Sequence, residues 1–499
     1  MAGDAGASSY NMQVRSDIPA RLDRLPWSRW HWRIVAALGI TWVLDGLEVT
    51  IVGTLSSRLT ERTTLHFSAS EIGAIASFYI AGAVIGAIFF GYLTDKMGRR
   101  RLFLVTLGWY TLFTVLTAFS WNFWTFAICR FLTGSGIGGE YAAINSAIDE
   151  LIPARRRGWT DLSINSSYWI GTMLGSALSL FFLDERLFPA NLGWRLCFAI
   201  GAVLALAVIY VRREVPESPR WLMTHGRVNA AEQIVKQIEE EVAREKGPLP
   251  PPSGTVVTVD TQRQVRYLDV ARSMIRQYPS RTFLSLSLMI TQAFLYNAIF
   301  FTEAIVLTTF FNVPSGSVGL YIFPFAIGNV LGPWLLGDLF DTFGRRPMIA
   351  ATYIISGVLL IGTGWLFVNG ALNATTITLC WSVIFFFASA GASSAYLTTS
   401  EIFPMEIRAN AIANVYAVGT LAGGAVAPYL FGILIQSHTA RQVFIGYLVG
   451  AFLMILGGLT EIVFGVDSER RSLEEIAAPL TATEVEGTAR RPRGRPAAA

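Results

Sequence analysis

Long apolar runs, separated by short polar segments, dominate this 499-residue sequence. A run of about 18 to 25 apolar residues, coiled as a helix, spans the hydrocarbon core of a bilayer. The pattern predicts twelve such helices, at approximately 33–56, 72–92, 102–120, 122–148, 160–183, 194–211, 282–311, 317–338, 347–367, 374–400, 409–435 and 441–465. We therefore expect an all-α polytopic membrane protein.

The composition supports a membrane protein and argues against a nucleic-acid partner. Hydrophobic residues make up 53% of the chain and charged residues 15%, with a mean hydropathy of +0.47. In a soluble domain charged residues normally make up about 25%. The formal charge of +4 comes from short basic clusters between the apolar runs, which is where loop topology places them. The sequence indicates a lipid bilayer as the surroundings and no binding to nucleic acid.

Two copies of one basic turn divide the chain into similar halves. The segment 91–101, Gly-Tyr-Leu-Thr-Asp-Lys-Met-Gly-Arg-Arg-Arg, joins two apolar runs. The segment 337–347 repeats its two glycines, its acid (Asp95, matched by Asp341) and its first two arginines at an offset of 246 residues (341 − 95). An offset near half the chain length predicts two pseudo-symmetric six-helix bundles.

The distribution of Lys and Arg sets the expected topology. Their clusters lie in the loops on one side of the twelve predicted spans, and such loops face the cytoplasm. We expect cytoplasmic termini and five segments: a tail (1–32), a six-helix bundle (33–211), a charged connector (212–281), a second bundle (282–465) and a disordered tail (466–499). Within the connector, residues 228–246 have the pattern of a helix.

A second repeated pattern places acids and arginines near the basic turns. Glu-x-x-Pro-x-x-x-Arg begins at Glu150 and again at Glu401, an offset of 251 residues (401 − 150). In each half, this acid and arginine can pair with the Asp and Arg of that half's basic turn and so close one face of the protein; solvated loop charge is the alternative. The expected cytoplasmic gate comprises Asp95, Arg99, Arg100, Glu150, Arg157, Asp341, Arg345, Arg346, Glu401 and Arg408.

The glycine pattern at 134–139 fits the GxGxxG of dinucleotide-binding proteins, and Asp161 follows about 20 residues on. No strand precedes these glycines, which interrupt an apolar run, so they indicate close packing between membrane helices instead. Cys129, Cys197 and Cys380 lie in separate spans without metal-ligand spacing. We expect no cofactor, no metal and no disulfide.

At these residues the chain resembles the major facilitator superfamily, and more narrowly its sugar-porter-like branch. The resemblance covers about 33–464 and includes both basic turns, Arg-x-x-x-Gly-x-Gly-x-Gly from Arg130, both Glu/Pro/Arg patterns and Pro-Glu-Ser-Pro-Arg-Trp-Leu at 216–222. It implies two bundles that rock about a central site, giving alternating access, and a transporter rather than an enzyme. We expect a monomer in a bacterial plasma (inner) membrane.

Two departures from the sugar-porter pattern bear on the substrate. Sugar porters usually carry Gln-Gln in span seven and Gly-Pro-x-x-Trp in span ten, whereas this chain has one glutamine, Gln292, and Ala-Ser-Ser-Ala-Tyr at 392–396. It looks more like prokaryotic relatives that move organic acids and other small metabolites. Our first expectation is a proton-coupled transporter of a small organic acid; the alternatives are a sugar or polyol transporter and a non-transporting nutrient sensor.

Ionisable residues inside the predicted spans are candidates for proton coupling, because a charge near the bilayer centre costs at least about 2.5 to 3.5 kcal/mol unless it is paired or wetted. Glu48 matches the acid that pairs with the span-four arginine, here Arg130, in proton-coupled sugar porters. Asp45, one helical turn earlier, lies on the same face. We expect Glu48 to carry the proton, with Asp45 in reserve; a static Glu48–Arg130 pair is the alternative.

Polar side chains in span seven are candidates for binding the substrate. Three of them share one stripe of the helix, and an acid lies nearer its outer end. Hydrogen bonds between helices are the alternative role. The expected substrate site comprises Arg130, Gln292, Tyr296, Asn297, Glu303 and Tyr396.

Overall fold

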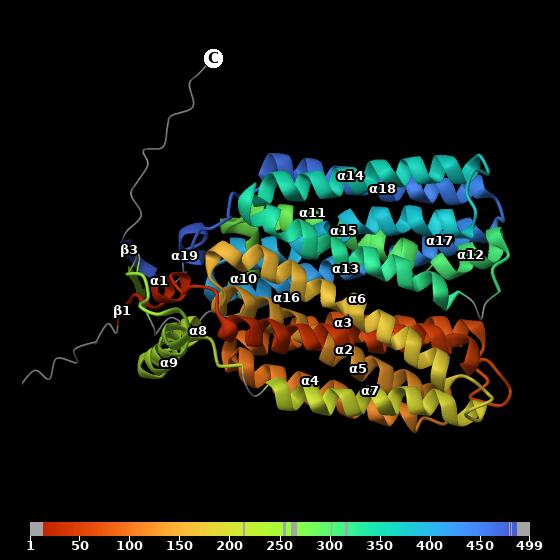
Figure 1. Ribbon diagram of the computed structural model, residues 1–499, viewed down its shortest axis with the longest axis horizontal. Coiled ribbons are helices and arrows are strands. Elements are labelled where there is room, and N and C mark those ends of the chain that lie inside the picture. The colour runs from red at the N-terminus through yellow and green to blue at the C-terminus, as the bar shows by residue number, and fades with distance from the viewer. Residues whose placement is uncertain are drawn as a thin grey trace, which may run out of the picture.

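The computed structural model describes residues 13–212, 215–252, 256–260, 267–300, 302–314, 318–478, 480 and 482–486. Long helices run side by side along the long axis of the molecule (Figure 1). Both ends of the described chain lie at the same end of this helical body, which we call the terminus-side end. The opposite end is called the far end.

The helices form two bundles that follow the predicted spans. The first bundle contains α2 (Arg29–Leu59), α3 (Ala69–Met97), α4 (Arg99–Ala118), α5 (Phe123–Leu151), α6 (Arg157–Phe182) and α7 (Ala190–Arg212). The second contains α11 (Pro279–Phe300), α12 (Glu303–Phe311), α13 (Gly319–Thr342), α14 (Arg345–Val368), α15 (Ala374–Ile402), α16 (Arg408–Gly419), α17 (Val426–Gln436) and α18 (Ala440–Phe464). Short 3₁₀ turns, η1 (Ala154–Arg156) and η4 (Met405–Ile407), precede α6 and α16.

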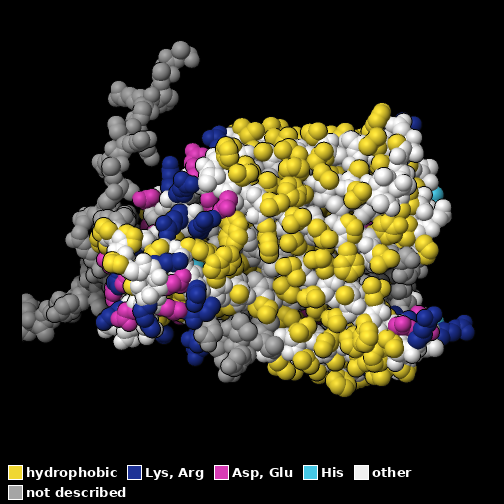
Figure 2. Space-filling model, viewed as in Figure 1, with side chains coloured by type: hydrophobic (Ala, Val, Ile, Leu, Met, Phe, Trp, Pro, Cys, Tyr) yellow, Lys and Arg dark blue, Asp and Glu magenta, His cyan; other side chains and the backbone are white. Residues whose placement is uncertain are grey.

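On the face that Figure 2 shows, apolar side chains cover the helical body, and most of the visible charged side chains gather at its terminus-side end. By length and composition alone, eight helices of the described chain can cross a membrane: α2, α3, α4, α11, α13, α14, α15 and α18. Helices α5 and α6 do not meet that criterion. Many of their polar residues are buried against protein, so they do not need a composition that suits contact with lipid.

Glycines set the short distance between α3 and α5. A Cβ atom on Gly86 would lie 1.9 Å from the carbonyl oxygen of Ser135, and one on Gly138 would lie 2.0 Å from that of Ala83. Only a hydrogen atom fits at these positions, so the two backbones approach more closely than larger residues would allow. The glycines at 134–139 therefore serve helix packing, as their context in the sequence indicates.

Spans seven and eleven are interrupted, whereas the apolar pattern predicts continuous helices. In span seven, α11 ends at Phe300 and α12 begins at Glu303. In span eleven, the π-helical turn η5 (Thr420–Gly424) separates α16 from α17. This wide turn packs closely on α11, because a Cβ atom on Gly423 would lie 2.4 Å from the carbonyl oxygen of Ile290. π-Helical turns of this kind are frequent at functional sites.

Short elements outside the bundles gather at the terminus-side end (Figure 1). They are β1 (Gln13–Ser16), α1 (Ile18–Asp23), α8 (Pro219–Thr224), α9 (Val228–Lys246), β2 (Val256–Asp260), α10 (Tyr267–Arg272), the π-helical turn η2 (Ser273–Gln277), α19 (Leu473–Ile476) and β3 (Ala482–Glu486). Helix α9 has the bounds that the sequence predicts. The strands form one antiparallel sheet in the order β1-β2-β3, a small addition to the expected all-α fold.

The C-terminal tail differs from the disordered segment that its composition predicts. The Ser468 hydroxyl donates to Glu401 Oε2 at 2.7 Å, and the Glu474 carboxylate lies 3.5 Å from the Arg220 guanidinium. Glu401 and Arg220 are fully buried, and buried charges require partners. The tail is ordered where it supplies those partners, which composition alone does not reveal. Residues 487–499 lie outside the described residues.

Candidate functional site

A cavity of about 1120 Å³ lies between the two bundles. Arg58, Glu61 and Asp184, which follow or end helices at the far end, line its mouth, and Asn165 and Tyr416 line its deeper part. All six residues of the expected substrate site line this one cavity: Arg130, Gln292, Tyr296, Asn297, Glu303 and Tyr396. The fold therefore brings together polar residues from both halves that lie up to 266 positions apart (396 − 130).

The ion pair between Glu48 and Arg130 lies on the first-bundle side of the cavity. It joins α2 to α5, and the two side chains are only 3% and 1% exposed. The Thr114 hydroxyl donates to the same carboxylate oxygen of Glu48 at 3.2 Å, and the guanidinium of Arg130 lies 4.7 Å from the ring centre of Tyr79. The predicted partners thus meet in a buried setting, where a paired charge is stabilised and an unpaired one is costly. Asp45 is also fully buried on α2.

The polar residues of span seven contact their own bundle as well as the cavity. The Tyr296 hydroxyl donates to Asn329 Oδ1 on α13 at 2.8 Å, and the Asn297 amide donates to the Ala293 carbonyl at 2.7 Å. Glu303 begins α12, is 3% exposed, and its Oε1 has no hydrogen-bond partner among the described residues. Tyr296 and Asn297 can therefore hold a substrate only by exchanging or sharing the contacts that they already make, whereas Glu303 Oε1 has no such contact to exchange.

Four aromatic residues form a cluster deep in the cavity, which we call the aromatic tetrad: Trp42, Tyr141, Tyr396 and Tyr416. Trp42 and Tyr141 stack with ring centres 4.6 Å apart, and Tyr416 meets Tyr141 edge-on at 5.0 Å. Of the four, the sequence singled out only Tyr396. Aromatic residues are common throughout membrane helices, and no spacing distinguishes those that line a cavity from those that face lipid.

Two buried ionic clusters close the terminus-side end beyond the tetrad. In the first cluster, Arg99 Nη2 lies 2.7 Å from Glu150 and 3.4 Å from Asp95, and Arg408 of the other half lies 3.4 Å from Glu150. Asp95 Oδ2 also accepts the backbone N–H of Asn410 at 3.1 Å and its amide at 2.8 Å. An acid of the first half therefore caps the start of α16 in the second.

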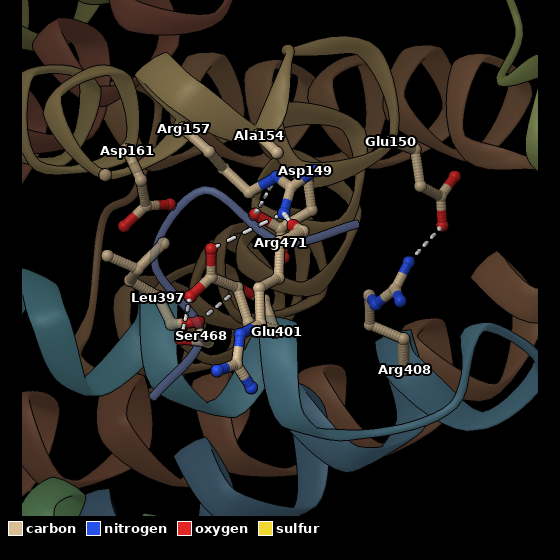
Figure 3. Close-up of polar contacts among 12 residues, drawn as sticks. Asp149, Glu150, Ala154, Arg157, Asp161, Leu397, Glu401, Arg408, Ser468 and Arg471 are labelled. Atoms are coloured by element: carbon tan, nitrogen blue, oxygen red, sulfur yellow. Dashed lines mark hydrogen bonds and ion pairs between the residues drawn. The ribbon is translucent and has the colours of Figure 1, made fainter. Parts of the chain in front are cut away.

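The second cluster mirrors the first. Arg345 lies 2.8 Å from Asp341 and 3.1 Å from Glu401, and Arg157 of the other half lies 3.5 Å from Glu401. Asp341 accepts the backbone N–H groups of Gly158 and Trp159 at 3.1 and 2.8 Å, at the start of α6. Figure 3 shows Glu401 directed toward Arg157 and Glu150 toward Arg408.

The arginines of the Glu/Pro/Arg patterns cross between the halves, which corrects the expectation that they pair within their own half. Arg157 reaches Glu401 and Arg408 reaches Glu150, because each begins a helix that faces the opposite bundle. Arg157 keeps two longer contacts in its own half, with Asp23 at 3.7 Å and Asp149 at 3.9 Å. Two further predicted gate residues make other contacts. Arg346 donates to the carbonyl of Ile462 in its own half, and the backbone N–H of Arg100 donates to Glu217 Oε1 at 3.3 Å.

Twelve spans in two bundles around one shared cavity define a membrane transporter of the major facilitator fold and not an enzyme. The chain belongs to the sugar (and other) transporter family, whose defining pattern matches residues 29–479. The resemblance stated from the sequence motifs is thereby confirmed.

Curated relatives are similar over nearly their whole length. A niacin transporter of Acinetobacter baylyi is 26% identical over 470 residues, which cover 92% of this chain and 99% of the relative. A putative metabolite transport protein of Escherichia coli, YdjK, is 29% identical over 486 residues, which cover 93% of this chain and 98% of the relative.

Solved structures share the fold. The proton:xylose symporter XylE bound to 6-bromo-6-deoxy-D-glucose matches with a TM-score of 0.73 at 20% identity, covering 90% of this chain and 98% of that chain. A partially occluded inward-open structure of the xylose transporter of E. coli gives a TM-score of 0.62 at 19% identity, covering 86% of this chain and 97% of that chain.

Proposed function

We propose that this chain is a secondary active transporter that moves a small organic acid together with a proton by alternating access. The observation that carries the proposal is the buried Glu48–Arg130 pair at the wall of the cavity. Protonation of Glu48 removes the partner charge of Arg130, which can then attract a substrate carboxylate. One proton and one anion thus enter together without leaving a net charge in the site.

The cavity supports an organic acid with a flat apolar body. The aromatic rings of Trp42 and Tyr141, which line the cavity, suit packing against a flat ring, and niacin, the substrate in the name of one relative, is a flat carboxylic acid. The side-chain amides of Gln292 and Asn297 favour the second candidate, a sugar or polyol, because amides pair well with hydroxyl groups. We place the protein in a bacterial inner membrane with its termini in the cytoplasm, so the closed terminus-side end makes this conformation outward-facing.

Uptake of a labelled metabolite panel into proteoliposomes, with and without an imposed pH gradient, tests the proposal. We expect an organic acid to be concentrated only when the gradient is present. Glu48→Gln should abolish this gradient-driven uptake and retain exchange between preloaded vesicles and medium. Arg130→Ala should also lose exchange, because it removes the charge that attracts the substrate and leaves Glu48 unpaired.

Asp45→Asn is the matched control, since it removes a buried carboxylate one turn away on the same helix. We expect it to keep the dependence on the pH gradient. Normal gradient-driven uptake by Glu48→Gln would overturn the assignment of the proton site. A panel in which only sugars or polyols are transported would overturn the substrate class.

A further inference from the structure

Asp161, on α6 one turn after Arg157, lies between the cavity and the second ionic cluster. It is 0% exposed. Its Oδ2 accepts the side-chain amide of Asn165 at 3.0 Å, while its Oδ1 has no hydrogen-bond partner in the described part of the chain. A buried carboxylate with one oxygen unsatisfied is a costly arrangement for the charged form. The transport mechanism proposed above does not use this residue.

Asn165 links Asp161 to the cavity. Its side chain lines the cavity, and the same amide that donates to Asp161 lies 3.4 Å from Asn145 Oδ1 on α5. Asp161 is therefore separated from the cavity by a single polar side chain. Figure 3 shows Asp161 at the edge of the group that contains Arg157, Asp149 and Glu401, and both of these acids lie within electrostatic range of it.

The internal repeat shows that Asp161 and its neighbour Asp149 are additional to the two ionic clusters, in which acids and arginines are equal in number. Each ionic cluster has two acids and two arginines: Asp95 and Glu150 with Arg99 and Arg408, and Asp341 and Glu401 with Arg345 and Arg157. At the repeat offset of 251 residues, Asp149 corresponds to Ser400 (400 − 149) and Asp161 to Ile412 (412 − 161). The first cluster has no carboxylate at these two repeat positions, although Glu217 accepts the backbone N–H of Arg99 beside it at 2.8 Å.

The groups around Asp161 add more negative than positive charge. Two acids, Asp149 of α5 and Glu401 of α15, and one arginine, Arg345 of α14, lie within electrostatic range of Asp161, as does Tyr396 of α15. Asp341 of α13 faces the preceding turn of α6, and α2 packs on α6 through a close approach of Gly46 to the Tyr168 backbone. The neighbouring Arg220 contacts two acids of its own, Asp23 and Glu474. Four buried carboxylates, those of Asp149, Asp161, Asp341 and Glu401, share the guanidinium groups of Arg157 and Arg345. Arg408 of α16 also lies within electrostatic range of Asp149, but it is paired with Glu150. A group with this excess of carboxylates reaches charge balance by binding protons.

We propose that Asp161 is a second proton-binding site, which holds a proton while the terminus-side end is closed and releases it when that end opens. Opening separates the two bundles, breaks the contacts of Arg157 with Glu401, and admits water to the cluster. The O–H bond of the Asp161 carboxyl group then breaks, and the proton leaves to that water. The proton that replaces it arrives from the cavity side, past Asn165. The role in transport rests on the proposed proton coupling, but the existence of the site does not.

Infrared difference spectroscopy on the full chain in liposomes tests the site directly, through the C=O stretching band of protonated carboxyl groups. We expect Asp161→Asn to remove one such band and Asp161→Glu to restore one. Glu140→Gln, which removes another buried acid of the same bundle, is the matched control and should leave that band in place. Retention of every protonated-carboxyl band in Asp161→Asn would overturn the proposal.

The link to opening is measured by the separation of the two halves at the terminus-side end as a function of pH. One released proton changes the ratio of open to closed states by up to about tenfold per pH unit. Asp161→Asn should reduce the number of protons released on opening by one and favour the closed state. A pH dependence in this variant equal to that of the wild type would overturn the link. If the uptake panel instead shows no gradient-driven transport, the proposed function fails while the Asp161 band and its pH dependence remain measurable.

Discussion

Replacing Asp95 with asparagine tests whether the ionic clusters hold the terminus-side end closed. Asp95 makes two hydrogen bonds to Asn410 across the halves, at 3.1 and 2.8 Å. A hydrogen bond to a charged group contributes about 1.5 to 3 kcal/mol and a neutral one about 0.5 to 1.5 kcal/mol. The substitution therefore weakens each bond by about 1 kcal/mol. Because both bonds are lost on opening, the ratio of open to closed states should rise about 30-fold.

Spin labels at cysteines introduced for Lys96 and Thr342, one in each half, report this ratio as a distribution of distances. Asp338→Asn is the matched control. It also removes an acid that pairs across the halves, with Arg156 at 2.6 Å, but the two side chains are 57% and 46% exposed. An exposed pair contributes about 0 to 1 kcal/mol, so the control should shift the ratio at most about fivefold. Equal effects of the two substitutions would refute the reasoning, since burial would then not set the strength of the gate.

Two further predictions concern stability. Gly86→Ala places a Cβ atom 1.9 Å from the Ser135 carbonyl oxygen. It should separate α3 from α5 at a cost of about 1 to 3 kcal/mol and so lower the melting temperature in detergent. Gly108→Ala is the control and should leave the melting temperature unchanged, because no atom lies within 4 Å of the new Cβ. Burial lowers the pKa of His225, whose ring stacks on Trp221 at 4.2 Å. Below the ordinary pKa of about 6.5 the folded chain binds fewer protons at His225 than the unfolded chain does. The contribution of His225 to the free energy of unfolding is therefore complete above that pH and is lost as the pH falls below it. His225→Gln should reduce the loss of melting temperature on acidification, and an unchanged loss would contradict the prediction.

The sequence predicted the number and order of the spans because bilayer thickness fixes the length of an apolar run. It also predicted α9, where the amphipathic pattern is strong and Gly247 stops the helix with a positive φ of 80°. It did not predict the interruptions in spans seven and eleven. Hydropathy records whether residues are apolar, and Thr-Leu-Ala-Gly-Gly at 420–424 is as compatible with an α-helix as with the π-helical turn that packing against α11 produces.

The candidate site was predictable to the extent that it is polar. A charged or amide side chain within a span has a high cost in lipid, so Glu48, Arg130 and Gln292 could be identified before their positions were known, and all lie at or beside one cavity. Trp42 and Tyr141 carry no such signal, because their rings are equally stable in lipid. Asp161 and Asn165 are also polar side chains within a predicted span, four residues apart. Their significance, however, depends on the ionic cluster that the fold places beside them.

The crossing of the two arginines follows from a limit of repeat symmetry. An offset of 251 residues shows that Arg157 and Arg408 are equivalent, but a network in which each pairs within its own half has the same symmetry as one in which they exchange partners. The choice depends on where the bundles meet. In the closed state α6 packs on α13 and α3 on α16, so each arginine begins a helix that already contacts the opposite bundle and reaches an acid of that bundle. Arg157 also lies 3.7 Å from Asp23 and 3.9 Å from Asp149 of its own half. An ion pair that crosses the interface breaks whenever the bundles separate, whereas one within a bundle survives. The exchanged pairing therefore allows the charges of both halves to oppose opening together.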